Sequence, residues 1–247
     1  MKAKETEKKD NLKANAGNID RMFAVGAHFG YSKSRRHPSI KPYIFGAKNW
    51  VEIIDLEKTD DLLKGATEFA KKLGAEGKKI LFVGSKDEAK QAIEEGAGAL
   101  DMPYVTGRWI GGTITNFSEI KKRLNKMEDL SSKKDKGELA QKYTKKEQVM
   151  LDREMDNLKT NFLGIGLMTE IPHTLFVVDT KKEMTSVKEA RQKRIPVIGL
   201  LNSDSNLSEI DYPIVANDAT RASIKFFVDE IVKAYKEGVK EGLKSKE

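Results

Sequence analysis

Four short apolar runs constrain the fold of this 247-residue chain more than any other feature of its sequence. They lie at residues 51–56, 79–84, 174–179 and 196–200, are rich in Val, Ile, Leu and Phe, and are bounded by Gly, Pro or Asp. Because the runs do not alternate between apolar and polar residues, they predict strands buried on both faces of a parallel sheet. Weaker strand candidates lie at residues 103–107 and 212–216.

Helical patterns occupy the stretches between these runs. Apolar residues share one face of a helix in residues 58–74, 86–100, 184–194 and 219–243. Strands that alternate with helices imply right-handed crossovers between parallel strands. The sequence therefore predicts an α/β fold in which helices cover both faces of a parallel sheet, giving three layers.

The segment from Asn116 to Leu163 breaks this alternation, because it carries no strand pattern and mixes 12 Lys/Arg with 9 Asp/Glu. Its apolar residues recur at spacings of four and three, which is the seam pattern of a coiled coil. Residues 131–137, SSKKDKG, separate its two halves. We expect an antiparallel coiled-coil hairpin that projects from the domain, and the alternative is a pair of ordinary surface helices. The seam residues are Ile120, Leu124, Met127, Leu151, Met155, Leu158 and Phe162.

These patterns divide the chain into an α/β domain with an insertion and two tails. Residues 1–18 are rich in Lys, Glu, Asn and Ala and are expected to form a mobile N-terminal tail. The α/β domain is expected to comprise residues 19–115 and 164–243, the inserted hairpin residues 116–163, and the C-terminal tail residues 244–247.

Composition limits the classes of function. A net charge of +7 and a pI near 9.2 favour an anionic partner such as nucleic acid or a membrane surface. No apolar run approaches the roughly 20 residues that span a membrane, and the N-terminal residues lack the apolar segment of a secretory signal. The absence of Cys excludes disulfides and thiolate metal sites and fits a cytoplasmic protein.

The sequence carries no recognisable catalytic motif. Neither glycine-rich phosphate loop follows the 79–84 run, the three His match no metal spacing, and no nucleophile elbow occurs. Asp55, Asp101 and Asp179 lie near strand ends, where α/β enzymes keep catalytic groups, but helix capping is their commoner role. We therefore expect no catalytic residue, metal, cofactor or small-molecule substrate. A small-molecule- or nucleotide-binding α/β enzyme with basic surface loops is the alternative.

The residues between Asp20 and Glu52 form an acid-free window in a chain with 38 acidic residues. Its Lys and Arg side chains are suited to phosphates, and its two Pro residues are expected to hold the loop extended. Tyr31 and His37 are candidates for stacking on unpaired bases. The window residues predicted to contact RNA are His28, Tyr31, Lys33, Arg35, Arg36, His37, Lys41 and Lys48.

The other aromatic residues of the window are expected to pack inwards and anchor it to the sheet; they are Phe23, Phe29, Tyr43 and Phe45. The aromatic residues at positions 43 and 45 predict a short strand with one buried face.

A second candidate segment is GRWIGGTITN, residues 107–116. Arg108 and Trp109 offer a guanidinium and an aromatic plane, and the adjacent glycines allow the backbone to approach a phosphate. Thr115 or Asn116 is a candidate cap of the first hairpin helix. A tight turn with Trp109 in the core is an alternative compatible with RNA binding. The residues predicted to contact RNA in and after this loop are Arg108, Trp109, Gly111, Gly112, Thr113, Thr115, Asn116, Lys121, Lys122 and Arg123.

Several motifs occur in a characteristic order: GAHFG (26–30), RRHPSIKPYIFGAKN (35–49), ILFVGSK (80–86), GRWIGGTITNF (107–117), IPHTLFVVD (171–179), VKEARQKRIPVIGL (187–200) and DYPIVANDATRASI (211–224). In this combination, over about residues 19–235, the sequence resembles the bacterial small-subunit ribosomal protein two family. The resemblance implies a flavodoxin-like or Rossmann-like parallel sheet with a protruding coiled-coil hairpin, and no catalysis. It also implies binding to small-subunit ribosomal RNA beside neighbouring ribosomal proteins, with no membrane partner.

The sequence departs from the family pattern at several positions. Tyr31 and Ser32 stand where the family usually has His and Gln, and Arg36 stands where a Trp is common. Residues 164–168 and 202–208 also differ from the usual motifs, so the resemblance predicts no role for them. A further hypothesis is that the hairpin docks proteins and that RNA binding is secondary.

Overall fold

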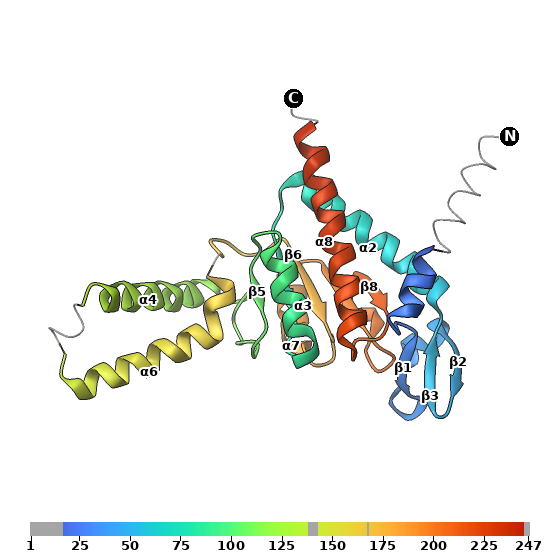
Figure 1. Ribbon diagram of the computed structural model, residues 1–247, viewed down its shortest axis with the longest axis horizontal. Coiled ribbons are helices and arrows are strands. Elements are labelled where there is room, and N and C mark those ends of the chain that lie inside the picture. The colour runs from blue at the N-terminus through green and yellow to red at the C-terminus, as the bar shows by residue number, and fades with distance from the viewer. Residues whose placement is uncertain (1–16, 138–142, 167, 245–247) are drawn as a thin grey trace.

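The computed structural model describes residues 17–137, 143–166 and 168–244. Figure 1 shows an α/β part in the centre, a small sheet at one end, and two helices that extend from the opposite end. Most of the two predicted tails, residues 1–16 and 245–247, lies outside the described residues. Residues 17–24 are helical.

Five parallel strands form the central sheet, in the order β5-β4-β6-β7-β8. The prediction of a parallel sheet is confirmed, and three of the four main apolar runs lie in strands whose residues are all buried. The chain crosses from one side of β4 to the other, so the strand order reverses between β4 and β6. The bounds are β4 (Ile80–Val83), β5 (Tyr104–Val105), β6 (Thr174–Val178), β7 (Val197–Leu201) and β8 (Tyr212–Val215).

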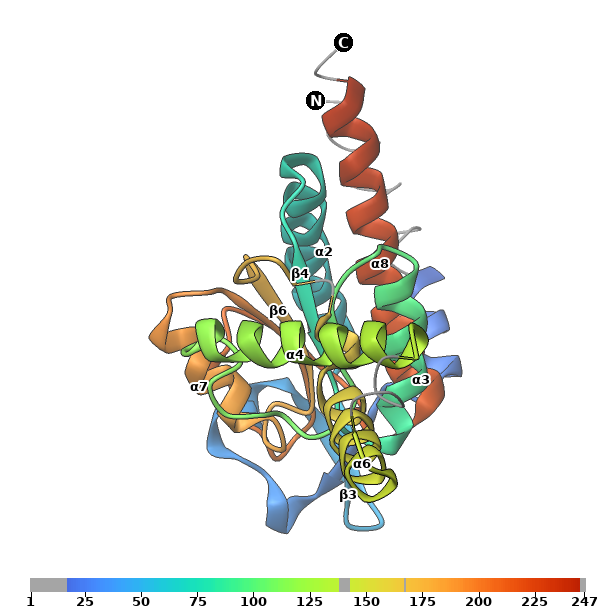
Figure 2. The same cartoon turned by 90° about the vertical axis from the view of Figure 1, so that its left-hand side faces the viewer.

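Helices cover both faces of this sheet. On one face, α2 (Leu56–Glu76), α3 (Asp87–Gly98) and α8 (Arg221–Lys244) share a core with Phe82 and Phe176. On the other face, α7 (Met184–Gln192) shares a second core with Leu81 and Val177. Figure 2 shows α7 on one side of β4 and β6 and α3 and α8 on the other. Alternate residues of each strand thus enter different cores, which is why the runs are apolar throughout.

The first apolar run is not part of the parallel sheet, so that prediction was wrong. Residues Val51–Ile54 form β3, the central strand of an antiparallel sheet in the order β1-β3-β2, with β1 (Phe29–Ser32) and β2 (Ile44–Lys48). Glu52 and Ile54 are buried, whereas Val51 is exposed. Only one face of this small sheet is covered by the domain, so its residues alternate in burial. A short strand, β2, does contain Phe45, but Tyr43 lies before it in a 3₁₀ turn and no residue of β2 is buried, so the expected buried face was wrong.

Two 3₁₀ turns, η1 (Lys33–Arg35) and η2 (Pro38–Tyr43), connect β1 to β2. The prediction that the prolines hold this loop extended was wrong for residues 38–43, where Pro38 begins η2 and Pro42 lies inside it. His37, before Pro38, is extended, as the steric effect of proline on the preceding residue requires.

The charged segment forms α4 (Phe117–Asp135) and α6 (Lys145–Phe162), followed by η3 (Leu163–Ile165); we call α4 and α6 the helix pair. Lys134 pairs with Asp152 at 2.7 Å and Lys126 pairs with Glu154, so the two helices run in opposite directions. The expected break at residues 131–137 comes later than predicted, because 131–135 are helical and Gly137 has a φ of 72°. Figure 1 shows the helix pair extending away from the α/β part.

The predicted seam is buried mainly along α4. Ile120, Leu124 and Met127 are buried there, together with Leu130. On α6 only Met155 and Phe162 are buried, and Leu151 and Leu158 are half-buried.

Candidate nucleic-acid interface

The acid-free window carries four exposed basic side chains, those of Lys33, Arg35, Lys41 and Lys48. None of the four pairs with a carboxylate among the described residues, although many other lysines of the chain do. Arg36 differs, because it donates to the buried carboxylate of Glu52 at 3.0 Å. The window therefore presents four positive charges that no acid of the described chain neutralises.

Three aromatic residues of the window point outwards, so the prediction that they pack inwards was wrong. Phe23 is 63% exposed, Phe29 48% and Phe45 81%. The register of β2 shifts between Ile44 and Gly46, and the irregularity leaves Phe45 outside the covered face. Tyr43 does pack against the core as expected.

His28 and His37 are half-buried, and both rings make contacts within the chain. The His28 ring lies between Phe23 and Phe29, with ring centroids 4.5 and 4.1 Å away, and burial lowers its pKa. The His37 Nδ1 accepts from the backbone N–H of Ser39 at 3.3 Å and caps η2. The stacking role expected of His37 thus competes with a capping role.

A largely buried ionic cluster fixes the window to the carboxyl edge of the parallel sheet. Lys86, which follows β4, lies 2.7 Å from Asp179 Oδ2 and 3.0 Å from Asp218 Oδ2. The same ammonium donates to the Tyr31 hydroxyl at 3.3 Å, and Asn202 donates to Asp218 at 3.0 Å. The Tyr31 hydroxyl is therefore already hydrogen-bonded at the edge of the parallel sheet.

Sequence reasoning missed this cluster, although its charged residues follow β4, β6 and β8 at the edge where parallel strands end together. Burial lowers the pKa of Lys86, but the carboxylates of Asp218 and Asp179 outweigh that effect and hold it above its ordinary value. Burial raises the pKa of the Asp218 carboxyl. The expectation that Asp55 caps a helix is confirmed, because its side chain accepts from the N–H of Glu57 at the start of α2.

Residues 202–208 hold the window backbone. The Ser203 hydroxyl accepts from the N–H of Tyr31 at 2.9 Å, and the Ser203 carbonyl accepts from the N–H of His37 at 2.8 Å. The N–H of Leu207 donates to the Ser39 hydroxyl at 3.0 Å. This segment, for which the sequence predicted no role, thus positions β1 and η2.

The loop at residues 107–116 is organised by Glu189 of α7, which sequence reasoning also missed. Its carboxylate accepts from Trp109 Nε1 at 3.0 Å and from the Gly112 N–H at 2.8 Å. It also accepts from the N–H groups of Ile114 and Thr115 and from the Thr115 hydroxyl, each at 3.1 Å. Burial raises the pKa of Glu189, but these donors outweigh it and hold the pKa below its ordinary value.

Many of the donors that were expected to meet a phosphate therefore already bind a carboxylate. Trp109 is 7% exposed and Thr113 2%, so the alternative of a turn with Trp109 in the core is confirmed and burial argues against direct RNA contact by either. Arg108, Gly111 and Asn116 are exposed. Asn116 occupies the N-cap position of α4, but its side chain makes no capping bond.

Two consecutive residues after β4, Ser85 and Lys86, lie next to the loop and the window respectively, at the same edge of the sheet. Lys86 contacts Tyr31 of the window, and Ser85 lines a pocket of about 640 Å³ beside Arg108 and Trp109. This pocket lies where the strand order reverses, the usual ligand site of such sheets. Its wall is partly closed by internal bonds, since Glu183 accepts from Ser85 and Lys182 donates to the Ser85 carbonyl at 3.2 Å.

Basic side chains continue onto the start of α4. Lys121, Lys122 and Arg123 are exposed, and Lys122 pairs with Glu119 at 2.6 Å. Lys121 lines a shallow hollow together with Thr115 and Asn116 of the loop. The first turns of the helix pair thus extend the basic surface of the loop.

The described residues contain no cluster of three or more His, Cys, Asp or Glu side chains arranged to hold a metal ion. Among the described helices, none has both the length and the apolar character needed to cross a membrane.

Comparison with known proteins identifies the family. The model of a family described as ribosomal protein S2 matches residues 22–238. The chain belongs to this family. The resemblance inferred from the sequence motifs is thereby confirmed.

Curated relatives in the ribosomal protein S2 family are similar over most of their length. The small ribosomal subunit protein uS2 of Acidothermus cellulolyticus is 41% identical over 218 residues, which is 88% of this chain and 79% of the relative. The protein of the same name from Chloroflexus aggregans is 38% identical over 229 residues, 93% of this chain and 96% of the relative. That of Coprothermobacter proteolyticus is 38% identical over 220 residues, 89% of this chain and 82% of the relative.

Membership of the ribosomal protein S2 family assigns the chain to translation as a ribosomal protein. The family is structural rather than enzymatic, which agrees with the expectation that the chain is not an enzyme.

Proposed function

We propose that the chain is a structural constituent of the bacterial small ribosomal subunit and that it binds small-subunit ribosomal RNA in the cytoplasm. The observation that carries the proposal is the set of four exposed, unpaired basic side chains on the acid-free window. Opposed carboxylates would cancel part of the field that attracts phosphates, and here the described chain supplies none. Relatives that carry the name small ribosomal subunit protein support this assignment.

The RNA-binding surface has three parts. The window supplies Lys33, Arg35, Lys41 and Lys48, with Arg36, Tyr31, His28 and His37 behind them. The loop supplies Arg108, Gly111 and Asn116, with Gly112 and Thr115 beneath, and the helix pair supplies Lys121, Lys122 and Arg123. We leave Trp109 and Thr113 out of the contact set because both are buried.

The helix pair is proposed to act as an inserted coiled-coil hairpin, residues 116–163, within an α/β domain of residues 19–115 and 164–243. Its ion pairs and its buried apolar stripe support this arrangement. Because it extends away from the α/β part, it can reach a second RNA segment or a neighbouring ribosomal protein (Figure 1).

Sedimentation of cell extract tests this function. The chain is expected in the small-subunit fraction at low salt, with affinity for purified small-subunit RNA that falls steeply between about 50 and 200 mM salt. Absence from small subunits at low salt would overturn the proposal.

A thermal-shift titration with mononucleotides tests the enzyme alternative, which the pocket beside Arg108 favours. The ribosomal assignment predicts no saturable stabilisation. Saturable stabilisation that is lost in Arg108→Ala would support a small-molecule site instead.

A further inference from the structure

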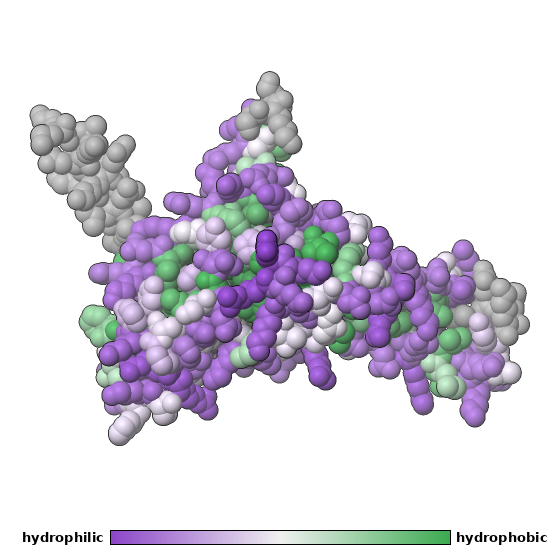
Figure 3. Space-filling model, turned by 180° about the vertical axis from the view of Figure 1, so that it is seen from behind, coloured by the Kyte–Doolittle hydropathy of each residue, from purple (hydrophilic) through white to green (hydrophobic). Residues whose placement is uncertain are grey.

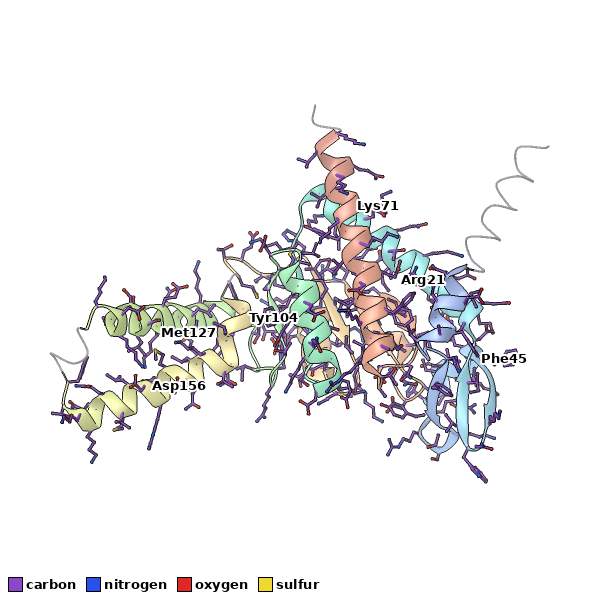
Figure 4. All side chains as sticks on the ribbon, viewed as in Figure 1. Arg21, Phe45, Lys71, Tyr104, Met127 and Asp156 are labelled. Atoms are coloured by element: carbon purple, nitrogen blue, oxygen red, sulfur yellow. The ribbon has the colours of Figure 1, made fainter. Side chains whose placement is uncertain are left out.

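The outer face of the β1-β3-β2 sheet is apolar and aromatic although nothing in the described chain covers it. Phe29 lies opposite Ile53 in the register of β1 and β3, and Phe45 extends from β2 on the same side. Val51 is 37% exposed. Figure 4 shows Phe45 at the outer margin of the small sheet, at the far end of the molecule from the helix pair. Contiguous apolar surface of this kind marks a binding surface more often than an accident of folding.

A groove of about 320 Å³ runs into this face, and we call the face and its groove the aromatic face. Phe23, His28, Phe45 and Ile53 line the groove, with Asp55 and Glu57 among the remaining lining residues. Asp55 is neutralised from within the chain, since Lys58 lies 3.2 Å from its Oδ2 atom. The groove is therefore walled by rings and bordered by two carboxylates: Asp55 has a cation, whereas the exposed Glu57 pairs with no cation of the described residues.

Trp50 lies at the tip of the β2–β3 hairpin beside this face. Its backbone conformation is unfavourable for a bulky residue. Asn49 and Trp50 have φ angles of 51° and 68° and connect the paired residues Lys48 and Val51. A two-residue turn of this kind favours Asn-Gly, because Gly adopts positive φ without a steric cost. The Trp50 side chain is 86% exposed, so its ring gains almost no packing in return. A strained bulky residue that packs on nothing indicates a role outside the folded chain.

The charge around the aromatic face selects the kind of partner. Lys48 lies on β2, between Phe45 and Trp50 in the sequence. Lys33 and Arg35 lie in η1 and Lys41 lies in η2, the turns that connect β1 to β2. No acid occurs from residue 21 to residue 51. Figure 3 shows hydrophobic atoms exposed among hydrophilic ones at the end of the molecule that holds this sheet. Flat rings interleaved with free cations match a polyanion with accessible bases better than the surface of a neutral protein.

We infer that the aromatic face binds a single-stranded segment of RNA, with unpaired bases stacked on Trp50 and Phe45 and phosphates at Lys48 and its basic neighbours. This inference rests on the proposed function and narrows it, because paired RNA offers its phosphates but not the faces of its bases. Stacking on aromatic side chains tolerates any base, so the face selects for strand state rather than sequence.

Tryptophan fluorescence of the full chain provides the test, with a short oligoadenylate RNA as the probe and an RNA duplex of the same length as its comparison. A base stacked on Trp50 quenches its emission, whereas Trp109 is buried and contributes a constant background. The single strand is expected to quench saturably and the duplex to bind without quenching. Trp50→Ala and Trp50→Leu are each expected to weaken single-strand binding about 5- to 150-fold, and Trp50→Phe far less.

The matched control is Tyr143→Leu, which removes an exposed aromatic ring two residues before α6 begins. It is expected to leave single-strand binding unchanged. Trp50→Gly gives an independent readout, because relief of the positive φ should raise the melting temperature while RNA binding falls. A lower melting temperature in Trp50→Gly would contradict the strain argument.

The outcomes separate this inference from the proposed function. If the unaltered chain shows no affinity for small-subunit RNA, both the proposed function and this inference are overturned. Retained affinity with equal binding of single strand and duplex, or with Trp50→Leu as good as the unaltered chain, would overturn the aromatic face alone. Normal RNA affinity in Trp50→Ala with reduced entry into small subunits would show that the face docks a protein, which also contradicts the inference.

Discussion

The window and the loop both lie at the carboxyl edge of the parallel sheet, and a charged side chain helps to hold each of them there. For the window that charge is the ammonium of Lys86, which binds Asp179, Asp218 and the hydroxyl of Tyr31. For the loop it is the carboxylate of Glu189, which accepts from Trp109, Gly112, Ile114 and Thr115. The two anchors have opposite signs, and they leave very different surfaces.

The difference lies in what remains free. The Lys86 ammonium holds the window through the Tyr31 hydroxyl, and Ser203 holds its backbone at Tyr31 and His37. The basic side chains of the window take no part in these bonds and stay exposed and unpaired among the described residues. A buried anion holds the loop by consuming its N–H and hydroxyl donors, which leaves mainly Arg108 and Asn116 exposed. Two segments with similar sequence chemistry can therefore contribute unequally to one interface, and the sign of the anchoring charge decides which contributes more.

The largest effect is expected from Lys86→Met, which removes the anchor of the window. The Asp218 side chain is fully buried and would keep an uncompensated charge, so the free energy of unfolding should fall by about 3–5 kcal/mol. Urea denaturation measures this loss, and hydrogen exchange should quicken at the amides of Tyr31 and His37. Lys90→Met is the control, because Lys90 pairs only with the exposed Asp87 among the described residues. A loss no larger than that of the control would contradict the anchoring role.

A somewhat smaller effect is expected from Glu189→Ala, which removes the anchor of the loop. Each buried donor left without an acceptor costs about 1–3 kcal/mol, but the loop can relax towards water, so we expect a total loss of about 3 kcal/mol. Urea denaturation measures the loss, and Glu88→Ala, an exposed carboxylate on α3, serves as the control. A change of less than 1 kcal/mol would show that the loop does not depend on this carboxylate.

The pH dependence of stability tests the same anchor more gently. The pKa of Glu189 in the folded chain lies below its ordinary value of 4.5, so its stabilisation is fully present above that value and is lost as pH falls through the folded-state pKa. The stability difference between the unaltered chain and Glu189→Gln should therefore shrink between about pH 6 and pH 3, because protonated Glu resembles Gln. Denaturation curves at several pH values give this difference. Parallel curves over the whole range would contradict the shift.

The sequence predicted the elements that depend on periodicity and composition. Continuous apolar runs at β4, β6 and β7 indicate strands buried on both faces, and those strands are the centre of the sheet. Glu52 within the run at 51–56 was a signal that this strand has a different environment, since a carboxylate fits poorly between two apolar layers. The apolar residues on either side of Glu52 nevertheless give this run the same pattern as the strands of the parallel sheet.

Side-chain direction and distant partners were harder to predict. An irregularity in β2 places Phe45 outside, and no local pattern reveals a register shift set by pairing with β3. Glu189 reaches the loop across 77 residues of sequence from Gly112, and Lys86 meets Asp218 across 132. Such pairs arise only when the sheet brings the ends of its strands together, so they require the tertiary fold.

The salt dependence of binding to small-subunit ribosomal RNA tests most directly whether the window, rather than the loop, carries the phosphate contacts. In one variant Lys33, Arg35, Lys41 and Lys48 are replaced by Ala, and in a second Arg108 and Asn116 are replaced. A control variant replaces Lys233, Lys236, Lys240 and Lys244, which are exposed on α8. Each lost phosphate contact lowers the salt slope by about 1, so the window variant should lose about 3–4 and the loop variant at most about 1. Equal losses in the window, loop and control variants would contradict the division between the two segments.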